Sequence, residues 1–331
     1  MDFDPTGEQS LLIETFNTLY AKWSGPDVVR QSEPLGFDAK LWGQLLEIGA
    51  LEMAEADGAS LLDLALVAEK HGQWLAPVPI IESQVAVRLL ARCATPAASA
   101  LLDSCVSGEQ MVTIALHPVD NGNLSLVPGG AIADVALAFD HDRLLAVPLE
   151  GNRTVVDNLG NLPLADVQVP DGTTELRSEA SAHFDAARDD WMTLTAAALS
   201  GLAAQALELG VNYAKERQAF GVSIGSFQAI AHPLADSATA RDGALLLARK
   251  AAWSVAGQPE RFGELAALAF AFAAETARDA SYRSLHTHGG YGFMKEYDIQ
   301  LYFRRAKAWP AVLMEPGRAY ALAAERRRGA P

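Results

Sequence analysis

The sequence has few cysteines, little positive charge and no excess of proline or glycine, and each of these features excludes a class of protein. It holds two cysteines, 16 prolines and 26 glycines among 331 residues. Cys93 and Cys105 are too few for a disulfide framework and show no metal-ligand spacing, so we expect a reducing, cytoplasmic setting and no metal. Because 50% of the residues are apolar and 20% are charged, a disordered or collagen-like chain is also excluded.

Basic side chains are outnumbered, since 26 lysines and arginines face 41 aspartates and glutamates, for a net charge of −15. This charge argues against nucleic acid or an anionic membrane as the main partner. The chain starts with Met-Asp-Phe-Asp-Pro, without an apolar signal region. The most apolar run, 265–274, is about half a bilayer span, and the longer run 192–211 is interrupted by Gln205 and Glu208. We therefore expect no membrane-spanning segment.

Hydrophobic spacing predicts an α+β fold in three parts. Apolar residues recur at steps of three and four in the first part, which predicts an N-terminal helical domain over 1–108. Short β-rich runs alternate with turn signals over 109–178, which predicts a reduced middle β domain. From 179 to 331 the pattern is helical and rich in small residues, so we expect a C-terminal four-helix bundle.

Local signals set helix boundaries within the first part. Asp38 is expected to cap a helix that Gly49 ends. A further helix is expected over 59–71, where Gly72 stops it. These assignments can be checked residue by residue against a structure.

Two motifs in the third part carry the functional argument. The first is Tyr213-Ala-Lys-Glu-Arg-Gln-Ala-Phe-Gly-Val-Ser-Ile-Gly-Ser-Phe-Gln228, which predicts a helix end, a glycine turn and the start of a second helix. The second is His286-Thr-His-Gly-Gly-Tyr-Gly-Phe-Met-Lys-Glu-Tyr297, followed by Arg304-Arg-Ala-Lys307. The first motif alone is a weak signal, because any helix end can carry a basic residue and a glycine. Their joint occurrence, in this order and at this spacing, is specific.

Together the motifs resemble the acyl-CoA dehydrogenase family, which has an Arg-x-x-Phe-Gly segment and a Gln-x-x-Gly-Gly-x-Gly segment at this spacing. The resemblance extends over the full order of domains and implies that the C-terminal bundle binds FAD across a subunit interface. It gives Arg217 the role of holding the flavin pyrophosphate. The arginine guanidinium is planar and permanently charged, which suits it to bind this anion. It also implies that Phe220 packs on the cofactor and that Gln228 contacts its adenosine half.

The second motif supplies three more positions that the resemblance assigns to FAD. His286 stands where the family usually has glutamine, and its imidazole can still form a hydrogen bond to the cofactor. Gly289 and Gly290 match paired glycines whose backbone approaches the phosphates, where a Cβ would obstruct the contact. In the family these contacts reach FAD bound mainly by a neighbouring subunit. The resemblance therefore implies that this chain keeps the half of the FAD site that acts in trans.

The other half of the family's FAD site is incomplete in this sequence. Family members carry a Thr-Glu-Pro-x-x-Gly-Ser-Asp loop that covers the flavin ring. Here the corresponding segment is Ala115-Leu-His-Pro-Val-Asp-Asn-Gly122, with His117-Pro118 in place of Glu-Pro and without the Gly-Ser-Asp element. We therefore expect that this chain does not hold its own flavin ring.

The family's usual catalytic base is also missing. In many members a glutamate lies nine residues after the arginine of Arg-Asp-Ala-Lys, and the same count from Arg304 reaches Leu313, which cannot act as a general base. Glu315 lies two positions further on, and a shifted loop would be needed to bring it inward. Glu315 is the first of two candidates for the base.

The second candidate comes from members that place the base on the helix before the first motif. The equivalent count reaches Trp191, next to Asp189 and Asp190. Asp190 is thus a candidate base. Both aspartates also suit the first turn of a helix, where they would complement its dipole, and we favour that interpretation.

These departures resemble the short subunit of the heteromeric (α2β2) acyl-CoA dehydrogenases of bacterial steroid side-chain catabolism, in which a full-length partner supplies the base and the flavin-ring loop. The resemblance implies α,β-desaturation of an acyl-CoA thioester, with a steroid side-chain CoA as a candidate substrate and an electron-transfer flavoprotein as acceptor. Two alternatives stay open. The chain is a flavin-free structural or regulatory module, or it is an autonomous homo-oligomeric dehydrogenase that uses Asp190 or Glu315.

The remaining charged and titratable residues have simpler interpretations. Arg326-Arg327-Arg328 is expected to be the solvated end of a C-terminal helix, where positive charge favours the dipole. Six histidines lack the spacing of a metal site and are expected at the surface or in caps: His71, His117, His141, His183, His232 and His288.

Overall fold

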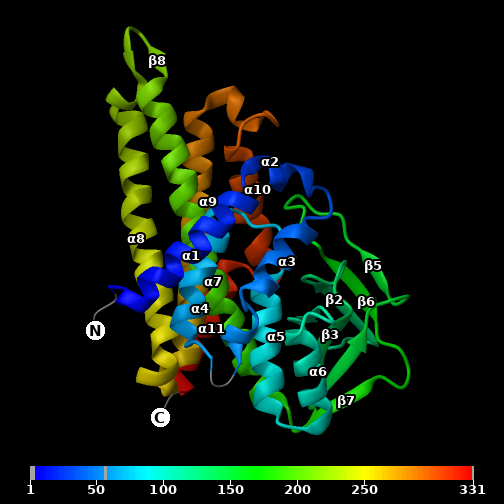
Figure 1. The fold of residues 1–331 in the computed structure, drawn as a ribbon. Coiled ribbons are helices and arrows are strands. Elements are labelled where there is room, and N and C mark those ends of the chain that lie inside the picture. Colours follow the sequence, from blue (N-terminus) through cyan, green and yellow to red (C-terminus); the bar gives the residue numbers. More distant parts are fainter. Residues whose placement is uncertain (1–3, 56–57, 330–331) are drawn as a thin grey trace. The chain divides into compact units, whose positions relative to one another are not determined.

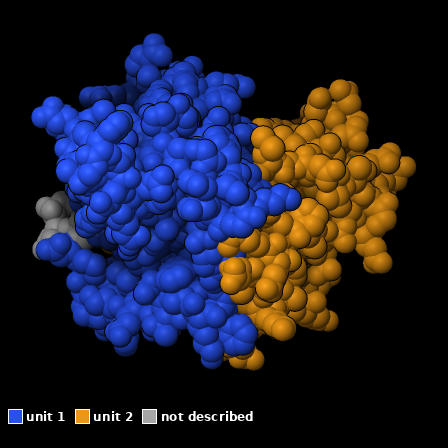
Figure 2. All heavy atoms as spheres, turned by 90° about the horizontal axis from the view of Figure 1, so that it is seen from above, with its two compact units in different colours: residues 1–26, 65–76, 192–331 blue, residues 27–64, 77–191 orange. Residues whose placement is uncertain are grey.

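A computed structural model describes residues 4–55 and 58–329. The described residues form two compact units, each built from segments that are distant in the sequence (Figure 2). The first unit takes the described residues up to Pro26, then Ala65–Ala76, and those from Met192 onward. The second takes the described residues of Asp27–Leu64 together with Pro77–Trp191.

The first unit is helical. Within the described residues its helices are α1 (Gly7–Trp23), the C-terminal part of α4 (Leu61–Gln73), most of α7 (Ser181–Glu216), α8 (Gln228–Gly257), α9 (Phe262–Thr287), α10 (Ile299–Ala311) and α11 (Pro316–Gly329). Helix α9 is central, because α8, α10 and α11 all pack against it. Alanines make up much of its buried surface and allow this close approach.

Glycines permit backbone contact between α4 and α7 in this unit. A Cβ added to Gly72 would lie 1.8 Å from the carbonyl oxygen of Ala198. A Cβ added to Gly201 would lie 1.9 Å from the carbonyl oxygen of Glu69. Any larger residue at either position would force the two helices apart.

The second unit combines helices with two small sheets (Figure 1). Its helices include α2 (Pro26–Gln31), α3 (Ala39–Glu47), α5 (Ile80–Cys93) and α6 (Pro96–Val106). Its strands are β1 (Val112–Ile114), β2 (Asn123–Val127), β3 (Val135–Asp140), β4 (Arg143–Pro148), β5 (Arg153–Val155), β6 (Ala165–Gln168) and β7 (Thr174–Ser178). One sheet has the order β1-β3-β4-β7 and the other has the order β2-β6-β5.

Strand register places the core of the second unit between the sheets. Strand β1 pairs with β3 in parallel, with Val112 opposite Val135, and the other neighbours are antiparallel. Alternate residues therefore point to one face of each sheet. Leu124, Ala136 and Val167, from three different strands, belong to one buried cluster.

The local signals in the sequence predicted several boundaries correctly. The carboxylate of Asp38 accepts a hydrogen bond from the backbone N–H of Leu41 at 2.7 Å and caps α3. Gly49 follows that helix in the left-handed region, with φ of 72°. The helix expected over 59–71 is α4, which begins two residues later and ends two residues later than predicted. Gly72 was expected to stop this helix and instead lies within it, so that expectation is wrong.

Helix α7 is the one helix in the described residues that is long and apolar enough to cross a membrane. Its most apolar window is 72% buried inside the fold. Burial of this kind is typical of the core helix of a folded domain, whose apolar surface is covered by protein.

Two histidines differ from the expectation of surface or capping positions. His71 is buried between the rings of Tyr20, at 6.1 Å, and Trp309, at 5.7 Å. Burial lowers the pKa of His71 to about 4. His288 is also buried, and its Nδ1 lies 2.7 Å from the carbonyl oxygen of Ser284. Sequence spacing could not reveal either burial, because the covering aromatic residues come from other helices.

Candidate functional site

Arg217 lies where α7 ends and a short hairpin begins. Its backbone N–H closes the helix on the carbonyl of Tyr213 at 2.8 Å, and its own carbonyl accepts from Ile224 across the hairpin. The hairpin strands are β8 (Gln218–Ala219) and β9 (Val222–Ser223). The side chain of Arg217 is exposed, and it forms no ion pair with any described residue. Its guanidinium is therefore available to an external anion.

Phe220 sits at the tip of this hairpin in an unfavourable conformation. Its φ is 53°, and Gly221 follows with φ of 82°, so both central turn residues are left-handed, as two-residue hairpins of this type require. A bulky residue in this region is an outlier. The side chain is nevertheless 97% exposed, with only an edge contact to Phe227 at 6.2 Å. The pairing of the two hairpin strands holds Phe220 in this conformation, which leaves its side chain open to an external contact.

The second motif begins at the C-terminal end of α9. His286 is exposed in the last turn, and its ring stacks on Tyr282 at 6.2 Å. Gly289 and Gly290 follow in a 3-10 turn, Gly289–Phe293. No described atom lies within 4 Å of a Cβ built on either glycine. Gly289 needs glycine for its φ of 60°, whereas the space above both backbones is open to an external group.

The fold brings the two motifs to the same end of the helical unit. Tyr213, in the last turn of α7, stacks on His288 with ring centroids 4.2 Å apart. Gly210 lies against Ser284, so α7 and α9 approach closely one turn earlier. Gln228, the first residue of α8, is exposed beyond the hairpin. Figure 1 shows the hairpin at the same end of the helices as the C-terminal end of α9.

Exposed apolar side chains surround these motif residues, and the sequence reasoning did not assign them. They lie in the hairpin and in the turn after α9, where a soluble monomer would expose polar groups. They are Val222, Phe227, Tyr291, Phe293 and Met294. Three of them, Tyr291, Phe293 and Met294, could have been noticed in the sequence, because they come shortly after the paired glycines Gly289 and Gly290.

The chemistry of these residues suits contacts to FAD. Arg217 offers a free fork for a pyrophosphate, and the open backbone at Gly289 and Gly290 offers close approach to an anion. All of them are on the outside of one helical unit.

Asp190 does not occupy the first turn of a helix, and that expectation is wrong. Helix α7 begins at Ser181, so Asp190 lies in its third turn. Its side chain is 0% exposed, and its Oδ2 accepts from Nε of Arg88 at 2.9 Å and from Nη2 of Arg92 at 2.5 Å. The carboxylate joins α5 to the start of α7, and a substrate cannot reach it in this arrangement.

Glu315 is exposed and lies just before α11. Its carbonyl accepts the N–H groups of Arg318 and Ala319, which places it at the start of that helix. Leu313, at the position reached by the family count, is buried. The loop thus presents an apolar side chain inward and a carboxylate outward.

Glu82 is a further carboxyl that sequence reasoning missed. It lies in the first turn of α5 and accepts a hydrogen bond from Nε1 of Trp191 at 3.1 Å. Burial raises the pKa of Glu82. It stands beside the residue at the second base position, although no spacing in the sequence connects residues so far apart.

The segment that replaces the family's flavin-ring loop is short and held against a strand. It joins β1 to β2, and Ala115 and Val119 donate backbone hydrogen bonds to Leu137 and Phe139 of β3. Asn121 and Gly122, both left-handed, close the turn. The loop therefore follows the edge of the sheet and has little length to cover a ring.

Comparison with known proteins gives these features a family. A family model described as "Acyl-CoA dehydrogenase, C-terminal domain" matches residues 192–311. Acyl-CoA dehydrogenase IpdE2 of Mycolicibacterium smegmatis is 31% identical over 318 residues, which cover 93% of this chain and 95% of the relative. The chain therefore belongs to the acyl-CoA dehydrogenase family, a family of FAD-binding oxidoreductases.

Solved structures share the fold along the whole chain. The ChsE4–ChsE5 complex from Mycobacterium tuberculosis contains a chain with a TM-score of 0.90 and 24% identity, and the match covers 100% of both chains. A steroid ACAD, Tcur3481–Tcur3483, gives a TM-score of 0.86 at 24% identity and covers 97% of this chain and 98% of its own. The predicted fold class is confirmed: helices, a small β region and C-terminal helices in the acyl-CoA dehydrogenase arrangement.

Proposed function

We propose that this chain completes, in trans, the FAD site of a full-length acyl-CoA dehydrogenase partner within a heteromeric enzyme. The observation that carries the proposal is the end of the helical unit where Arg217, Phe220, Gln228, His286, Gly289 and Gly290 are exposed together. Charge, open backbone and uncovered apolar side chains meet there. Such a surface suits a cofactor whose remaining contacts come from another chain.

Each residue has a defined part in that site. Arg217 binds the pyrophosphate through charge-assisted hydrogen bonds, and Phe220 excludes water from the cofactor. Gly289 and Gly290 let the backbone approach the phosphates, while His286 and Gln228 supply polar contacts. FAD, when bound, supplies the hydride acceptor for α,β-desaturation of an acyl-CoA thioester.

The surroundings of the two candidate bases, Asp190 and Glu315, favour a catalytic base that the partner supplies. Asp190 is engaged by two arginines and has no exposed surface, and Glu315 points to solvent beside a buried Leu313. Neither arrangement offers a carboxylate to an acyl chain. This argues against an autonomous homo-oligomeric dehydrogenase that uses either residue.

Two relatives support a substrate class and a heteromeric state. The Tcur3481–Tcur3483 relative is titled a steroid ACAD, and the ChsE4–ChsE5 relative is a complex of two chains. We extend both features to this chain and propose a steroid side-chain CoA as substrate and a heteromeric state. An electron-transfer flavoprotein is the acceptor that we expect.

The test is to purify the chain alone and after co-expression with a full-length family member, and to measure flavin absorbance and native mass. We expect flavin only in the complex, at one FAD for each pair of unlike chains. Flavin in the lone chain would favour the autonomous dehydrogenase. A folded complex without flavin would favour the structural or regulatory module.

A further inference from the structure

His288 is the residue on which the elements of both motifs meet. It directly precedes Gly289 and Gly290, and its ring stacks on Tyr213, which lies one helical turn before Arg217. All of these residues belong to the first unit. His288 is only 7% exposed, and the FAD contacts proposed above do not include it. Any effect of His288 on a cofactor is therefore indirect.

Two hydrogen bonds fix His288 at the end of α9. Its Nδ1 lies 2.7 Å from the carbonyl oxygen of Ser284, and because a carbonyl only accepts, Nδ1 carries the proton. The backbone N–H of His288 donates to the carbonyl of Leu285 at 3.1 Å. Burial lowers the pKa of His288, so the ring is neutral near pH 7. The imidazole thus has one tautomer and one orientation in this fold.

The turn after α9 folds back against the same residue. The ring of Tyr297 meets the His288 ring edge-on, with centroids 6.0 Å apart, and contacts Tyr291 with centroids 5.6 Å apart. A Cβ added to Gly292 would lie 2.6 Å from the carbonyl oxygen of Leu285 and 3.3 Å from the Cβ of His288. The turn that contains the paired glycines is therefore anchored on His288 by the residues that follow it.

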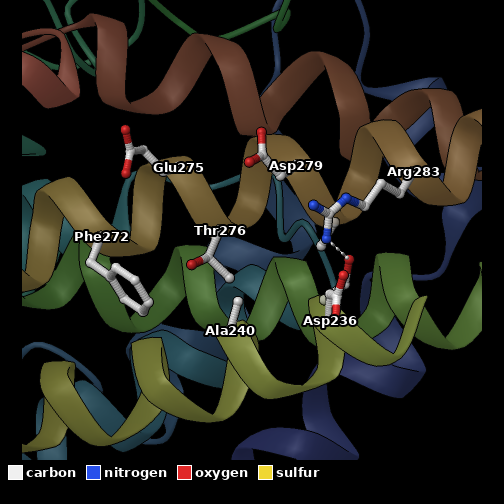
Figure 3. Close-up of a pocket in the computed structure, with 9 residues that line it drawn as sticks. Asp236, Ala240, Phe272, Glu275, Thr276, Asp279 and Arg283 are labelled. Carbon is white, nitrogen blue, oxygen red and sulfur yellow. Dashed lines mark hydrogen bonds between the residues drawn. The ribbon is translucent and has the colours of Figure 1, made fainter. Parts of the chain in front are cut away.

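The end of α9 is also held on α8. Arg283 lines a small cavity between the two helices, and Figure 3 shows its side chain reaching from α9 towards α8. Its Nη1 donates to the Pro233 carbonyl at 3.2 Å and to the Ser237 hydroxyl at 3.1 Å. Arg283 directly precedes Ser284, whose carbonyl holds the His288 ring. His288 is therefore attached to a helix end that is itself fixed.

We propose that His288 is a positioning residue for the FAD site proposed above, because its ring holds the hairpin that begins at Arg217 and the backbone of Gly289 and Gly290 in one arrangement. The inference rests on that proposed function. A site whose groups are fixed before binding loses less conformational freedom when the ligand binds. Removing the ring should therefore weaken flavin binding, although His288 does not touch the cofactor.

The test is flavin titration of the heteromer, co-expressed as above, with variants at position 288. His288→Asn keeps a side-chain donor but removes the ring, and we expect flavin affinity to fall about tenfold. His288→Phe keeps a flat ring that can stack on Tyr213, and its affinity should stay within about threefold of wild type. His232→Asn, at an exposed histidine of α8, is the matched control and should bind flavin as wild type does.

A double-mutant cycle separates positioning from a general loss of stability. In the wild-type background Arg217→Ala should weaken flavin binding by about tenfold to a hundredfold. In the His288→Asn background the same change should cost about threefold or less, because the guanidinium is no longer held in place. A purely structural role would lower the melting temperature of His288→Asn and leave the two effects on flavin affinity additive. If His288→Asn does not fold, Tyr213→Leu removes the other ring of the stack and replaces it in the cycle.

The outcomes separate this inference from the proposed function. If the wild-type heteromer holds no flavin, both fail. If wild type binds flavin and His288→Asn binds it as tightly as His232→Asn, or if the cycle is additive, the positioning role is refuted and the proposed function stands. A loss of affinity in His288→Asn that His288→Phe restores, together with a smaller effect of Arg217→Ala, supports the role.

Discussion

Tyr213 and His288 stack ring on ring, with centroids 4.2 Å apart and planes 25° apart. The contact joins the last turn of α7 to the residue that follows α9. Arg217 lies four residues after one ring, and Gly289 lies directly after the other. This pair of rings therefore sets the position of the first motif relative to the second.

Replacing Tyr213 by alanine should loosen that arrangement. An aromatic pair contributes about 0.5–1.5 kcal/mol beyond the burial of its surface. We expect the free energy of unfolding to fall by at least this amount. Tyr213→Phe keeps the ring and should retain most of the stability. Urea unfolding followed by circular dichroism measures both. Equal losses in the two variants would mean that the hydroxyl, and not the stack, is what matters.

Replacing Arg217 by alanine should weaken flavin binding in the assembled complex without unfolding the chain. The lost charge-assisted hydrogen bond is worth about 1.5–3 kcal/mol, or one to two decades in affinity. Arg217→Lys keeps the charge without the fork and should be intermediate. Flavin titration of the complex gives the affinity, and the melting temperature of the lone chain is the control. Unchanged flavin affinity would remove Arg217 from the proposed site.

Replacing Asp190 by asparagine should destabilise the protein, because it leaves Arg88 and Arg92 without their carboxylate. Breaking a buried ion pair from one side costs about 3–5 kcal/mol. Glu315→Gln, at an exposed position, should change stability by less than about 0.5 kcal/mol. Chemical denaturation tests both variants. A stable Asp190→Asn protein that has lost only dehydrogenation activity would instead identify Asp190 as the base.

Stability should fall as the pH drops from about 6.5 towards 4, in part because of His71. Burial lowers the pKa of His71 from 6.5 to about 4, so the unfolded chain takes up a proton at a pH where the folded chain does not. The loss amounts to about 1.4 kcal/mol per pH unit within this window and levels off below it. Above pH 6.5 the group contributes no such loss.

His71→Phe tests this contribution, since phenylalanine can fill the space beside Tyr20 and Trp309 and does not titrate. Urea unfolding at pH 7 and pH 5 should show a smaller decline in this variant than in wild type. His141→Gln, at a 93% exposed side chain, should keep the wild-type decline. Equal pH dependence in all three proteins would contradict the assignment to His71.

Replacing Gly201 by alanine should be strongly destabilising, although alanine normally favours helices. The added methyl would lie 1.9 Å from the Glu69 carbonyl oxygen, and overpacking of this kind costs about 1–3 kcal/mol or more. Gly43→Ala, inside α3 with no described atom within 4 Å of its Cβ, should stabilise by about 0.5–1 kcal/mol. Thermal melts of the two variants should move in opposite directions.

Sequence reasoning predicted the parts of the fold that local chemistry determines. The cap at Asp38 and the helix that became α4 follow from residues within one or two turns of each other. Strands β5 and β7 carry little such local signal, because Arg153–Val155 and Thr174–Ser178 bury almost no alternate residues and lack the period of a half-buried strand.

The candidate site also has a part that local sequence predicts and a part that only the structure reveals. The motif residues around Arg217 and Gly289 could be named from spacing, and that they function as a site stays a proposal. The pairing of Asp190 with Arg88 and of Trp191 with Glu82 joins residues about a hundred positions apart. No local pattern encodes those contacts, so burial and ion pairing at the base positions had to come from the structure.

The interleaving of the two units has a consequence for synthesis on the ribosome. Every segment of the second unit precedes Met192, whereas the first unit needs the described residues from Met192 onward. Because domains fold as the chain emerges, the second unit can fold before translation ends. Helix α1 and the end of α4 must wait for α7 to α11 to be made. Until then their apolar faces are exposed, and chaperones have a defined interval in which to bind them.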